Sequence, residues 1–289
     1  MEVIRAKTAG FCMGVSLALK RLDEAIEQRR SDGRLLMLGP IIHNPSVLEH
    51  YRQKGVVCAG SHEEVLPGDT VVIRAHGIPK AVEEELNARG AYVVDATCPR
   101  VKAAQLAIAN ATRGGIPLWL FGEADHPEVR GLISYAEGDC LVFSEADASK
   151  AFRCNEYQPV VLAAQTTQEK AVFQALSERL RQRCPKLHVL STICDATSKR
   201  QAEARAIARQ VQLMLVLGGF SSGNTRRLVD VAKAEGARAL HVETMTDLPL
   251  EELASYARIG LTAGASTPHA MIDEVQALLE NLPGGKELA

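Results

Sequence analysis

The sequence predicts an α/β protein with three similar α/β modules around a pseudo-threefold axis, each with a mostly parallel four-stranded sheet, and a functional site at the centre. Two observations lead to this prediction. Val- and Leu-rich runs alternate with amphipathic runs of helical period along the 289 residues, which is typical of parallel sheets covered by helices on both faces. Polar loops that follow the apolar runs also recur at intervals of about 90 to 100 residues, too long for a solenoid repeat.

Twelve apolar runs have the length and the aliphatic content of strands. They form three groups of four, except that the third group has only three strands before the chain ends, so the N-terminal run is expected to complete its sheet. The expected modules are residues 12–97, 98–193 and 194–282, with the strand in residues 1–11 added to the last. The expected strands lie near residues 3–7, 34–39, 55–59, 70–75, 91–96, 117–122, 140–144, 159–164, 187–193, 213–218, 238–243 and 258–263.

Amphipathic runs of helical period fill most of the gaps between these strands. Strands that alternate with helices in this way favour parallel pairing within each module. The clearest helical runs are residues 17–30, 79–89, 101–113, 169–183, 198–211 and 225–236.

The composition is that of an ordinary soluble globular protein, with 46% hydrophobic and 24% charged residues. A net charge of −2 provides no basic field for nucleic acid. The longest apolar stretches, such as residues 213–217, are too short to cross a membrane, and the N-terminus has no hydrophobic signal core. We therefore expect a cytoplasmic protein that binds neither nucleic acid nor membrane.

Polar residues repeat in the loops that follow corresponding strands of the three groups. In open α/β sheets, ligands bind beyond the carboxyl ends of the strands, so modules around one axis would bring these loops to one pocket. The alternative is three ordinary α/β units without a shared site, because strand-end loops are polar in most proteins. Counted from Gly39, Gly122 and Gly218, position +4 is His43, His126 and Ser222, and position +6 is Pro45, Glu128 and Asn224; a second set is His76, Thr166 and Ser266.

Three of these residues, His43, His76 and His126, have a proline within the next three positions. Proline suits the first turn of a helix, and a helix N-terminus with free N–H groups favours an anion. No GxxxxGK[ST] motif occurs, which argues against a nucleoside triphosphate. The loops therefore predict a phosphate or diphosphate site, although a single histidine is more often an ordinary surface or core residue.

Three cysteines, Cys12, Cys98 and Cys194, share one local pattern, in which each ends a strand-like run and precedes a helix-like run. Three thiolates from separate parts of the chain suit an iron–sulfur cluster with one iron left open for a substrate. Two other interpretations stay open. Free cysteine is a common small core residue, and zinc is a rival metal, although structural zinc sites usually have paired ligands two to four residues apart.

The remaining cysteines lack this pattern and are expected to be structural. An odd number of cysteines in a large chain also argues against disulfide bonds. These residues are Cys58, Cys140, Cys154 and Cys184.

Glu128 stands two residues after His126, at the expected start of a helix. The helix dipole alone would favour an acid there. A carboxyl group at this place could instead donate a proton to an anionic substrate, and the spacing leaves both interpretations open.

Eight short motifs occur in a single order between about Cys12 and Ser266: GFCMGV, RAHG, DATCP, HPEV, QTT, TIC, SSGNT and TAGAS. In this order they resemble the LytB family, the 4-hydroxy-3-methylbut-2-enyl diphosphate reductases that complete the methylerythritol phosphate route to isoprenoids. Each motif is weak alone, whereas the ordered set covers nearly the whole chain and is specific.

The resemblance implies a reductase that acts on a small allylic diphosphate, (E)-4-hydroxy-3-methylbut-2-enyl diphosphate. Its products are isopentenyl and dimethylallyl diphosphates, formed by two-electron reductive dehydroxylation, and ferredoxin or flavodoxin supplies electrons in such enzymes. The resemblance further implies one 4Fe–4S cluster with three Cys ligands, Cys12, Cys98 and Cys194, and one open iron.

The family's functional positions also fall on residues of this chain. Glu128 matches the acid that supplies protons, Thr166 matches the threonine near the substrate hydroxyl, and His126 completes the catalytic set. The substrate-binding positions fall on His43, His76, His126, Thr166, Ser222, Gly223, Asn224 and Ser266.

One departure from the family pattern is visible. Where the family often has N-S-S-N, this chain has glycine at position 223, so one hydroxyl contact to the diphosphate is missing while the backbone N–H remains. Two alternatives from other functional classes are a non-catalytic iron–sulfur sensor or regulator and a zinc-dependent hydrolase.

Overall fold

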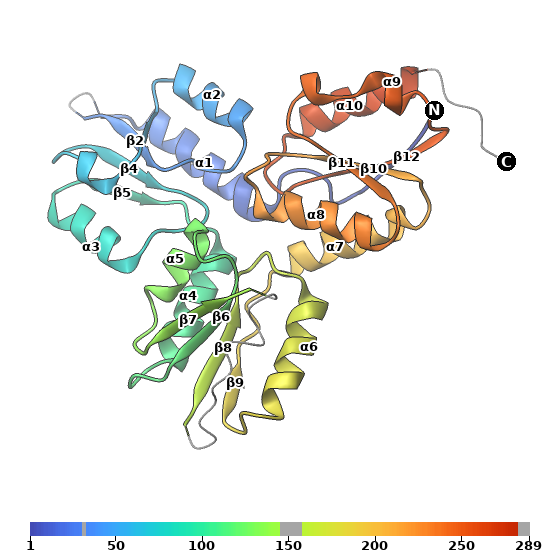
Figure 1. The fold of residues 1–289 in the computed structure, drawn as a ribbon. Helices are drawn as coiled ribbons and strands as arrows, with labels where there is room; N and C mark the ends of the chain where they lie inside the picture. Colours follow the sequence, from blue (N-terminus) through green and yellow to red (C-terminus); the bar gives the residue numbers. More distant parts are fainter. Residues whose placement is uncertain (31–32, 145–157, 283–289) are drawn as a thin grey trace. The chain divides into compact units, whose positions relative to one another are not determined.

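The computed structural model of the protein describes residues 1–30, 33–144 and 158–282. Within these ranges it contains three four-stranded sheets whose neighbouring strands all run parallel (Figure 1). Each of the twelve strands expected from the sequence is found, so the predicted α/β class with parallel four-stranded sheets is confirmed.

The first sheet has the strand order β3-β2-β4-β5. All four residues of β2 are buried, because helices cover both faces of a parallel sheet. On one face, Leu36, Val71 and Ile73 share a core cluster with Leu86 of α3. The elements of this part of the chain are α1 (Met13–Glu27), β2 (Leu35–Leu38), α2 (Pro45–Gln53), β3 (Val57–Ala59), a 3-10 helix (His62–Glu64), β4 (Thr70–Ile73), α3 (Lys80–Ala88) and β5 (Tyr92–Asp95).

The second sheet, with the order β7-β6-β8-β9, shows the two-residue period of a strand most clearly. On β6, Leu118 and Leu120 pack with α4 and α5, whereas Trp119 and Phe121 pack with α6 on the opposite face. Figure 1 shows these helices on the two sides of the sheet. The elements are α4 (Pro99–Ala111), β6 (Leu118–Phe121), α5 (Pro127–Ile133), β7 (Cys140–Phe143), β8 (Val160–Ala164), α6 (Lys170–Arg181) and β9 (Leu187–Val189).

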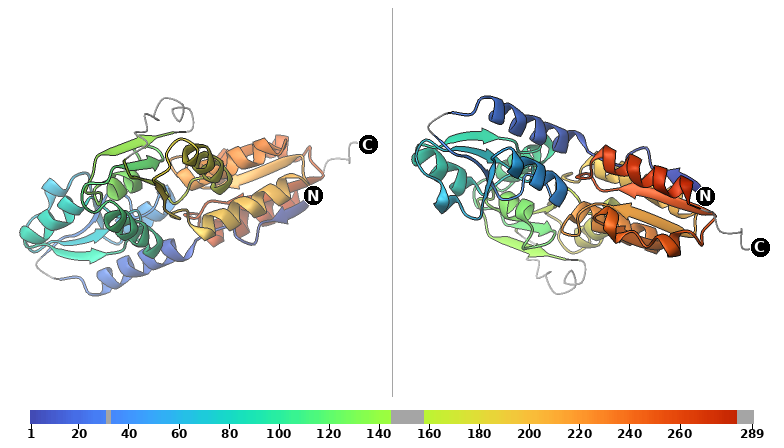
Figure 2. Two further views of the ribbon diagram at one scale, coloured as in Figure 1. Left: turned by 90° about the horizontal axis from the view of Figure 1, so that it is seen from below. Right: turned by 90° about the horizontal axis from the view of Figure 1, so that it is seen from above.

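The third sheet has the order β1-β12-β10-β11, so the N-terminal strand completes it. β1 pairs with β12 in the register Glu2↔Arg258 to Arg5↔Leu261, which confirms the predicted pairing of the N-terminal strand with the last group. Helix α10 covers one face, and α7 with α8 covers the other (Figures 1 and 2). The elements are β1 (Glu2–Arg5), α7 (Asp195–Ala208), β10 (Leu213–Leu217), α8 (Gly223–Ala234), β11 (Arg238–Val242), a 3-10 helix (Met245–Asp247), α9 (Leu250–Leu253), β12 (Arg258–Ala263) and α10 (His269–Asn281).

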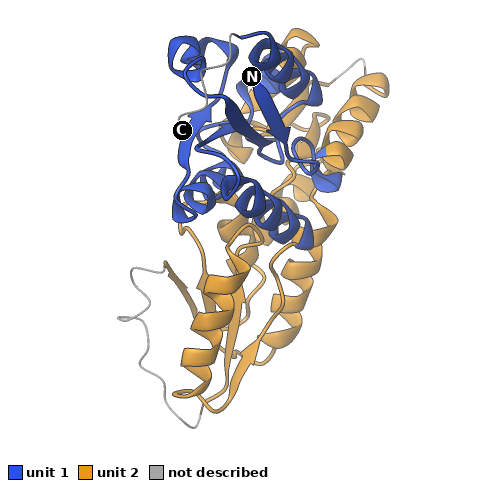
Figure 3. Ribbon diagram, turned by 90° about the vertical axis from the view of Figure 1, so that its right-hand side faces the viewer, with its two compact units in different colours: residues 1–15, 42–49, 195–289 blue, residues 16–41, 50–194 orange. Residues whose placement is uncertain are grey.

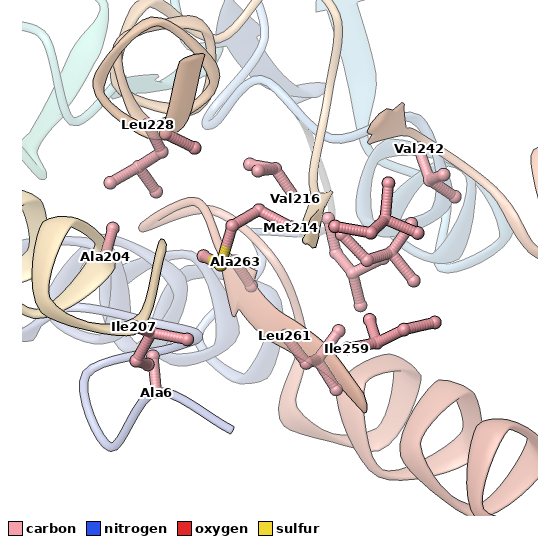
Figure 4. Close-up of a cluster of buried hydrophobic side chains, with 14 of the residues drawn as sticks. Ala6, Ala204, Ile207, Met214, Val216, Leu228, Val242, Ile259, Leu261 and Ala263 are labelled. Carbon is pink, nitrogen blue, oxygen red and sulfur yellow. The ribbon is translucent and has the colours of Figure 1, made fainter. Parts of the chain in front are cut away.

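The core of the third sheet joins residues from both ends of the chain. Ala6, which follows β1, lies in the same cluster as Ala204 and Ile207 of α7 and Leu261 of β12 (Figure 4). All five residues of β10 are buried in this cluster. The hydrophobic effect therefore fixes the start of the chain against an element nearly 200 residues later in the sequence.

The chain divides into two compact units (Figure 3). Unit 1 contains residues 1–15, 42–49 and 195–289 and holds the third sheet; unit 2 contains residues 16–41 and 50–194 and holds the other two sheets. The expected module boundaries, 12–97, 98–193 and 194–282, and their pseudo-threefold arrangement stay predictions.

Two sequence-based expectations need correction. Helices α1 and α7 begin at Met13 and Asp195, directly after Cys12 and Cys194 and three to four residues before the expected positions 17 and 198. Cys184 is buried and disulfide-bonded, so the expectation of no disulfide is wrong there. The expectation for Cys154 lies outside the described residues.

No helix among the described residues is long and apolar enough to cross a membrane.

Candidate active site

Each of the three patterned cysteines directly precedes a helix. Helices α1, α4 and α7 begin at the residue after Cys12, Cys98 and Cys194, respectively. The backbone N–H of each cysteine donates a hydrogen bond to a carbonyl two residues beyond the end of a neighbouring strand. The acceptors are Ala265 for Cys12 (3.3 Å), Ala75 for Cys98 (3.0 Å) and Thr166 for Cys194 (2.9 Å). The repeat predicted from the sequence is therefore present in the local hydrogen bonding of the three loops.

The start of a helix favours negative charge on the three cysteine sulfurs. N–H groups at a helix N-terminus lack intrahelical partners and carry a partial positive charge, which stabilises a thiolate ligand. Val15 donates its N–H to Cys12 Sγ at 3.5 Å, so the sulfur of Cys12 already accepts one such bond. None of the three cysteines is disulfide-bonded. Their convergence on one cluster stays a prediction, since Cys12 belongs to unit 1 and the other two to unit 2.

Glu128 and Thr166 form a buried pair in unit 2. Glu128 lies in the first turn of α5 and is only 2% exposed, and Thr166 follows β8. The N–H of Thr166 donates to Glu128 Oε1 at 2.6 Å, and its hydroxyl donates to Oε2 at 3.0 Å. Because the carbonyl of Thr166 accepts the N–H of Cys194, one residue connects the buried carboxyl group with the backbone of a cysteine.

Burial changes the acidity of this carboxyl group. It raises the pKa of Glu128 to about 7, although the two hydrogen bonds from Thr166 act in the opposite direction. A carboxylic acid with a pKa near neutrality is protonated in about half of the molecules at pH 7 and can deliver that proton. Burial and a raised pKa are typical of groups that transfer protons, whereas the helix dipole alone would favour an acid in this first turn, so the role of Glu128 as proton donor stays a prediction.

Two imidazole rings, those of His126 and His76, lie beside α5, the helix that carries Glu128. His126 is the N-cap residue of α5, and its Nδ1 accepts the N–H of Glu128 at 3.1 Å. Since Nδ1 accepts, the neutral ring carries its proton on Nε2. The ring of His76 meets that of His126 edge to face, with centroids 5.4 Å apart, and each ring offers a nitrogen within 4.8 Å of the other. Such a pair can donate to oxygens of one anion.

A second polar group lies in unit 1, around the start of α8. Ser222 is the N-cap of α8 and accepts the N–H of Thr225, while Gly223 and Asn224 form the first buried turn. Nδ2 of Asn224 is buried and has no hydrogen-bond partner among the described residues. A buried amide donor without an acceptor is costly, and a ligand oxygen would satisfy it.

His43 and Ser266 also belong to unit 1. The hydroxyl of Ser266 donates to the carbonyl of His43 at 3.2 Å, and Ser221 Oγ lies 3.4 Å from His43 Nδ1. A Cβ at Gly219 would lie 2.4 Å from the same carbonyl, so a glycine is required there for the two loops to approach. These contacts bring His43 and Ser266 together, as the repeat predicts, and add Ser221.

The correspondence between the three modules differs by one residue in two loops. Thr167, and not Thr166, is three residues beyond the end of its strand, as His76 and Ser266 are beyond theirs. Asn44, and not His43, takes the N-cap position of α2, with Oδ1 accepting the N–H of Val47 at 3.2 Å. The Asn-Pro dipeptide was the available sequence signal for this cap.

A protein-family model described as LytB protein matches residues 3–280 of the chain. A 4-hydroxy-3-methylbut-2-enyl diphosphate reductase of Nitratidesulfovibrio vulgaris (strain DSM 19637 / Miyazaki F) is 56% identical over 283 residues, which are 98% of this chain and 100% of the relative. The reductase of Aquifex aeolicus is 38% identical over 290 residues, with 99% and 98% covered.

The chain belongs to the LytB family. The resemblance identified from the eight ordered motifs is thereby confirmed.

Solved LytB-like structures agree with this assignment. The structure described as (E)-4-hydroxy-3-methyl-but-2-enyl diphosphate reductase, the terminal enzyme of the non-mevalonate pathway, has 39% identity and a TM-score of 0.68, covering 97% of this chain and 99% of its own. A reductase from Plasmodium falciparum has a TM-score of 0.92 at 24% identity, covering 98% and 89%. At that identity the likeness concerns the fold alone.

Proposed function

We propose that this LytB protein is a 4-hydroxy-3-methylbut-2-enyl diphosphate reductase, the last enzyme of the methylerythritol phosphate pathway. The reaction breaks the allylic C–O bond of the substrate, consumes two electrons and two protons, and releases water with isopentenyl or dimethylallyl diphosphate. The chain aligns with essentially the whole length of the relatives that carry this name. The structural observation that carries the proposal is the buried Glu128–Thr166 pair with its bond to Cys194.

The donor set of the chain suits the iron–sulfur cofactor that LytB enzymes contain. Cys12, Cys98 and Cys194 are not disulfide-bonded, and each directly precedes a helix whose N-terminus favours a thiolate. We assign them as the three ligands of one 4Fe–4S cluster with an open iron. When bound, the cluster supplies electrons and a Lewis-acidic iron for the substrate hydroxyl. Ferredoxin or flavodoxin is the proposed source of the electrons.

Glu128 is assigned as the proton donor. Hydroxide is a poor leaving group, so a proton delivered to the substrate oxygen lowers the barrier to C–O cleavage. The raised pKa keeps this proton available near neutral pH. Thr166 holds both carboxyl oxygens and thereby fixes the direction of delivery.

The diphosphate is assigned to the polar residues of the strand-end loops. Imidazole, hydroxyl and amide donors bind phosphoryl oxygens, and helix N-termini add positive potential. The buried, unpartnered amide of Asn224 supports this role. The diphosphate lies away from the bond that breaks, so its binding energy positions the allylic alcohol. The assigned residues are His43, His76, His126, Ser222, Gly223, Asn224 and Ser266.

The proposal is tested by anaerobic purification followed by iron and sulfide analysis and a turnover assay with a reduced electron donor. We expect iron and sulfide in the protein and consumption of the allylic diphosphate. Iron and sulfide without turnover would favour a sensor, and zinc in place of iron would favour a hydrolase.

We also propose that the protein is cytoplasmic. Five cysteines that are not disulfide-bonded agree with a reducing compartment, whereas the disulfide at Cys184 does not.

A further inference from the structure

The loop that carries Cys12 is the longest of the three cysteine loops. Residues 6–12 connect β1 with α1, whereas residues 96–98 and 190–194 precede the other two helices. A longer connection has more conformational entropy to lose. The N–H of Cys12 also makes the longest of the three equivalent hydrogen bonds, 3.3 Å to Ala265. The position of this cysteine therefore depends on what else holds residues 6–12.

One carboxylate of α7 binds the first half of this loop. Glu203 Oε1 accepts the N–H of Lys7 at 2.8 Å, and Oε2 accepts both the N–H and the hydroxyl of Thr8, at 2.8 and 2.6 Å. Partial burial raises the pKa of Glu203, but these hydrogen bonds outweigh it and the net shift is downward. The carboxylate therefore stays charged and serves as a threefold acceptor.

A guanidinium one turn earlier on α7 binds the second half. Arg200 is 4% exposed, and its Nη2 donates to the carbonyl of Gly10 at 2.9 Å while Nη1 donates to the carbonyl of Ala263 at 2.8 Å. Ala263 ends β12, which is the strand that pairs with β1. Arg200 thus connects the loop to the sheet from which the loop departs.

A side chain of α10 also lies close to Gly10. Gly10 has φ +101°, and a Cβ there would lie 2.6 Å from the ring of His269 at the start of α10. The ring of Phe11 meets the same ring in an edge-to-face arrangement, with centroids 6.4 Å apart. Gly10 is therefore approached both by the guanidinium group on α7 and by the imidazole ring on α10.

We propose that Arg200 and Glu203 are positioning residues that hold the 6–12 loop so that the sulfur of Cys12 is presented for iron binding. This inference rests on the proposed function for the role of Cys12. These two residues, called the clamp below, act through backbone atoms of Lys7, Thr8 and Gly10 and through the hydroxyl of Thr8, and neither is among the residues assigned to the substrate. Because both side chains project from one helix three residues apart, they act on the loop as a unit.

The first test uses the apoprotein, so it does not depend on the cofactor. Arg200→Met and Glu203→Ala are compared with Lys199→Met, an exposed neighbour on the same helix. The readout is the iodoacetamide alkylation rate of each cysteine, followed by peptide mass spectrometry. We expect the rate at Cys12 to rise about threefold or more in both variants, by local opening of the loop, with Cys98 and Cys194 unchanged and the control like the parent.

The two substitutions distinguish a loss of order in the 6–12 loop from a change in the electrostatic environment of the thiol. Removing Arg200 deletes a positive charge and removing Glu203 deletes a negative one, so a charge effect on thiol reactivity would have opposite signs. An increase in both variants reports loss of order. Equal acceleration at all three cysteines, or no change at Cys12, overturns the proposal. Arg200→Lys and Glu203→Gln retain a donor or an acceptor and are expected to give a smaller rise at Cys12 than the first pair. If the first pair fails to fold, a rise at Cys12 alone in these two variants supports the proposal, and the absence of any selective rise overturns it.

The second test measures iron retained after anaerobic reconstitution. We expect the two clamp variants to lose iron faster than Lys199→Met on exposure to a chelator. If the parent protein binds no iron, the proposed function fails while the alkylation result still decides the clamp. If the parent binds iron and the clamp variants retain it equally well with a protected Cys12, the clamp fails and the proposed function stands.

Discussion

Thr166 does three things at one position of the chain. Its N–H and hydroxyl each bind one oxygen of Glu128, and its carbonyl accepts the N–H of Cys194. The acid is consequently held in one orientation with both oxygens satisfied, at a depth where burial raises the pKa to about 7. The chemistry proposed for this LytB protein needs such a group, because the proton must be present before the C–O bond breaks.

Glu128→Gln tests this role directly. The amide keeps the size of the side chain, and its oxygen can still accept the N–H of Thr166, but it cannot supply the proton. We expect turnover to fall by about 100-fold or more, with iron content unchanged. Asp125→Asn in the same loop, at a fully exposed position, is the control and should retain full turnover. Near-normal turnover of Glu128→Gln would mean that protons arrive from another group.

The pH dependence follows from the raised pKa of Glu128. The protonated form is the active one, so kcat/KM should decline above about pH 7, and this decline should be absent from the residual activity of Glu128→Gln.

The free energy of unfolding should also decrease as the pH rises. The native state binds more protons than the unfolded chain between pH 4.5 and about 7, so the unfolding free energy falls across this window, by on the order of 3 kcal/mol. Urea unfolding at several pH values checks this, and a profile that rises with pH would contradict it.

At the scale of elements, helix starts organise the functional side chains. Cys98, His126 and Ser222 are the N-cap residues of α4, α5 and α8. The first turns of these helices provide N–H groups and positive potential where thiolates and phosphate oxygens are expected. The strands supply the other half of the arrangement, because parallel strands place all their carboxyl ends, and the loops that follow, at one edge of a sheet.

Gly10→Ala tests the approach of α10 to the cysteine loop. The substitution would place a Cβ against the ring of His269 and force an unfavourable positive φ. We expect a loss of about 1–3 kcal/mol in unfolding free energy and faster hydrogen exchange in residues 7–12. Gly90→Ala is the matched control, with φ +77° and no atom within 4 Å of the added Cβ. Equal losses in the two variants would show that backbone strain alone matters.

At the scale of the whole molecule, three separate sheets contribute to the proposed chemistry, and in one of them residues 2–5 pair with residues 258–261. β1 joins the sheet of β10, β11 and β12, so Cys12 is carried by the same unit as Asn224 and Ser266. Glu128, Thr166, Cys98 and Cys194 belong to the other unit. The two units thus divide the assigned ligands and the assigned proton donor between them.

Single Cys→Ser substitutions test the ligand set across the molecule. Replacing Cys12, Cys98 or Cys194 should remove most of the iron, because each would leave the cluster with two thiolates. Cys58→Ser and Cys140→Ser are controls at exposed positions that lack the strand–cysteine–helix pattern, and both should retain the parental iron and sulfide content. Retention of full iron content after any of the first three substitutions would remove that cysteine from the ligand set.

The sequence by itself determined the twelve strands and six of the helices, the completion of the third sheet by residues 2–5, and membership of the LytB family. These features depend on local periodicity and on short motifs that are readable in one dimension. Only the tertiary structure shows that Glu128 is buried and bound by Thr166, because these contacts arise between segments 38 residues apart, and its role as proton donor stays a proposal. The same is true of Arg200 and Glu203. On α7 they resemble ordinary charged helix residues, and their role becomes visible only where the fold brings the start of the chain beneath them.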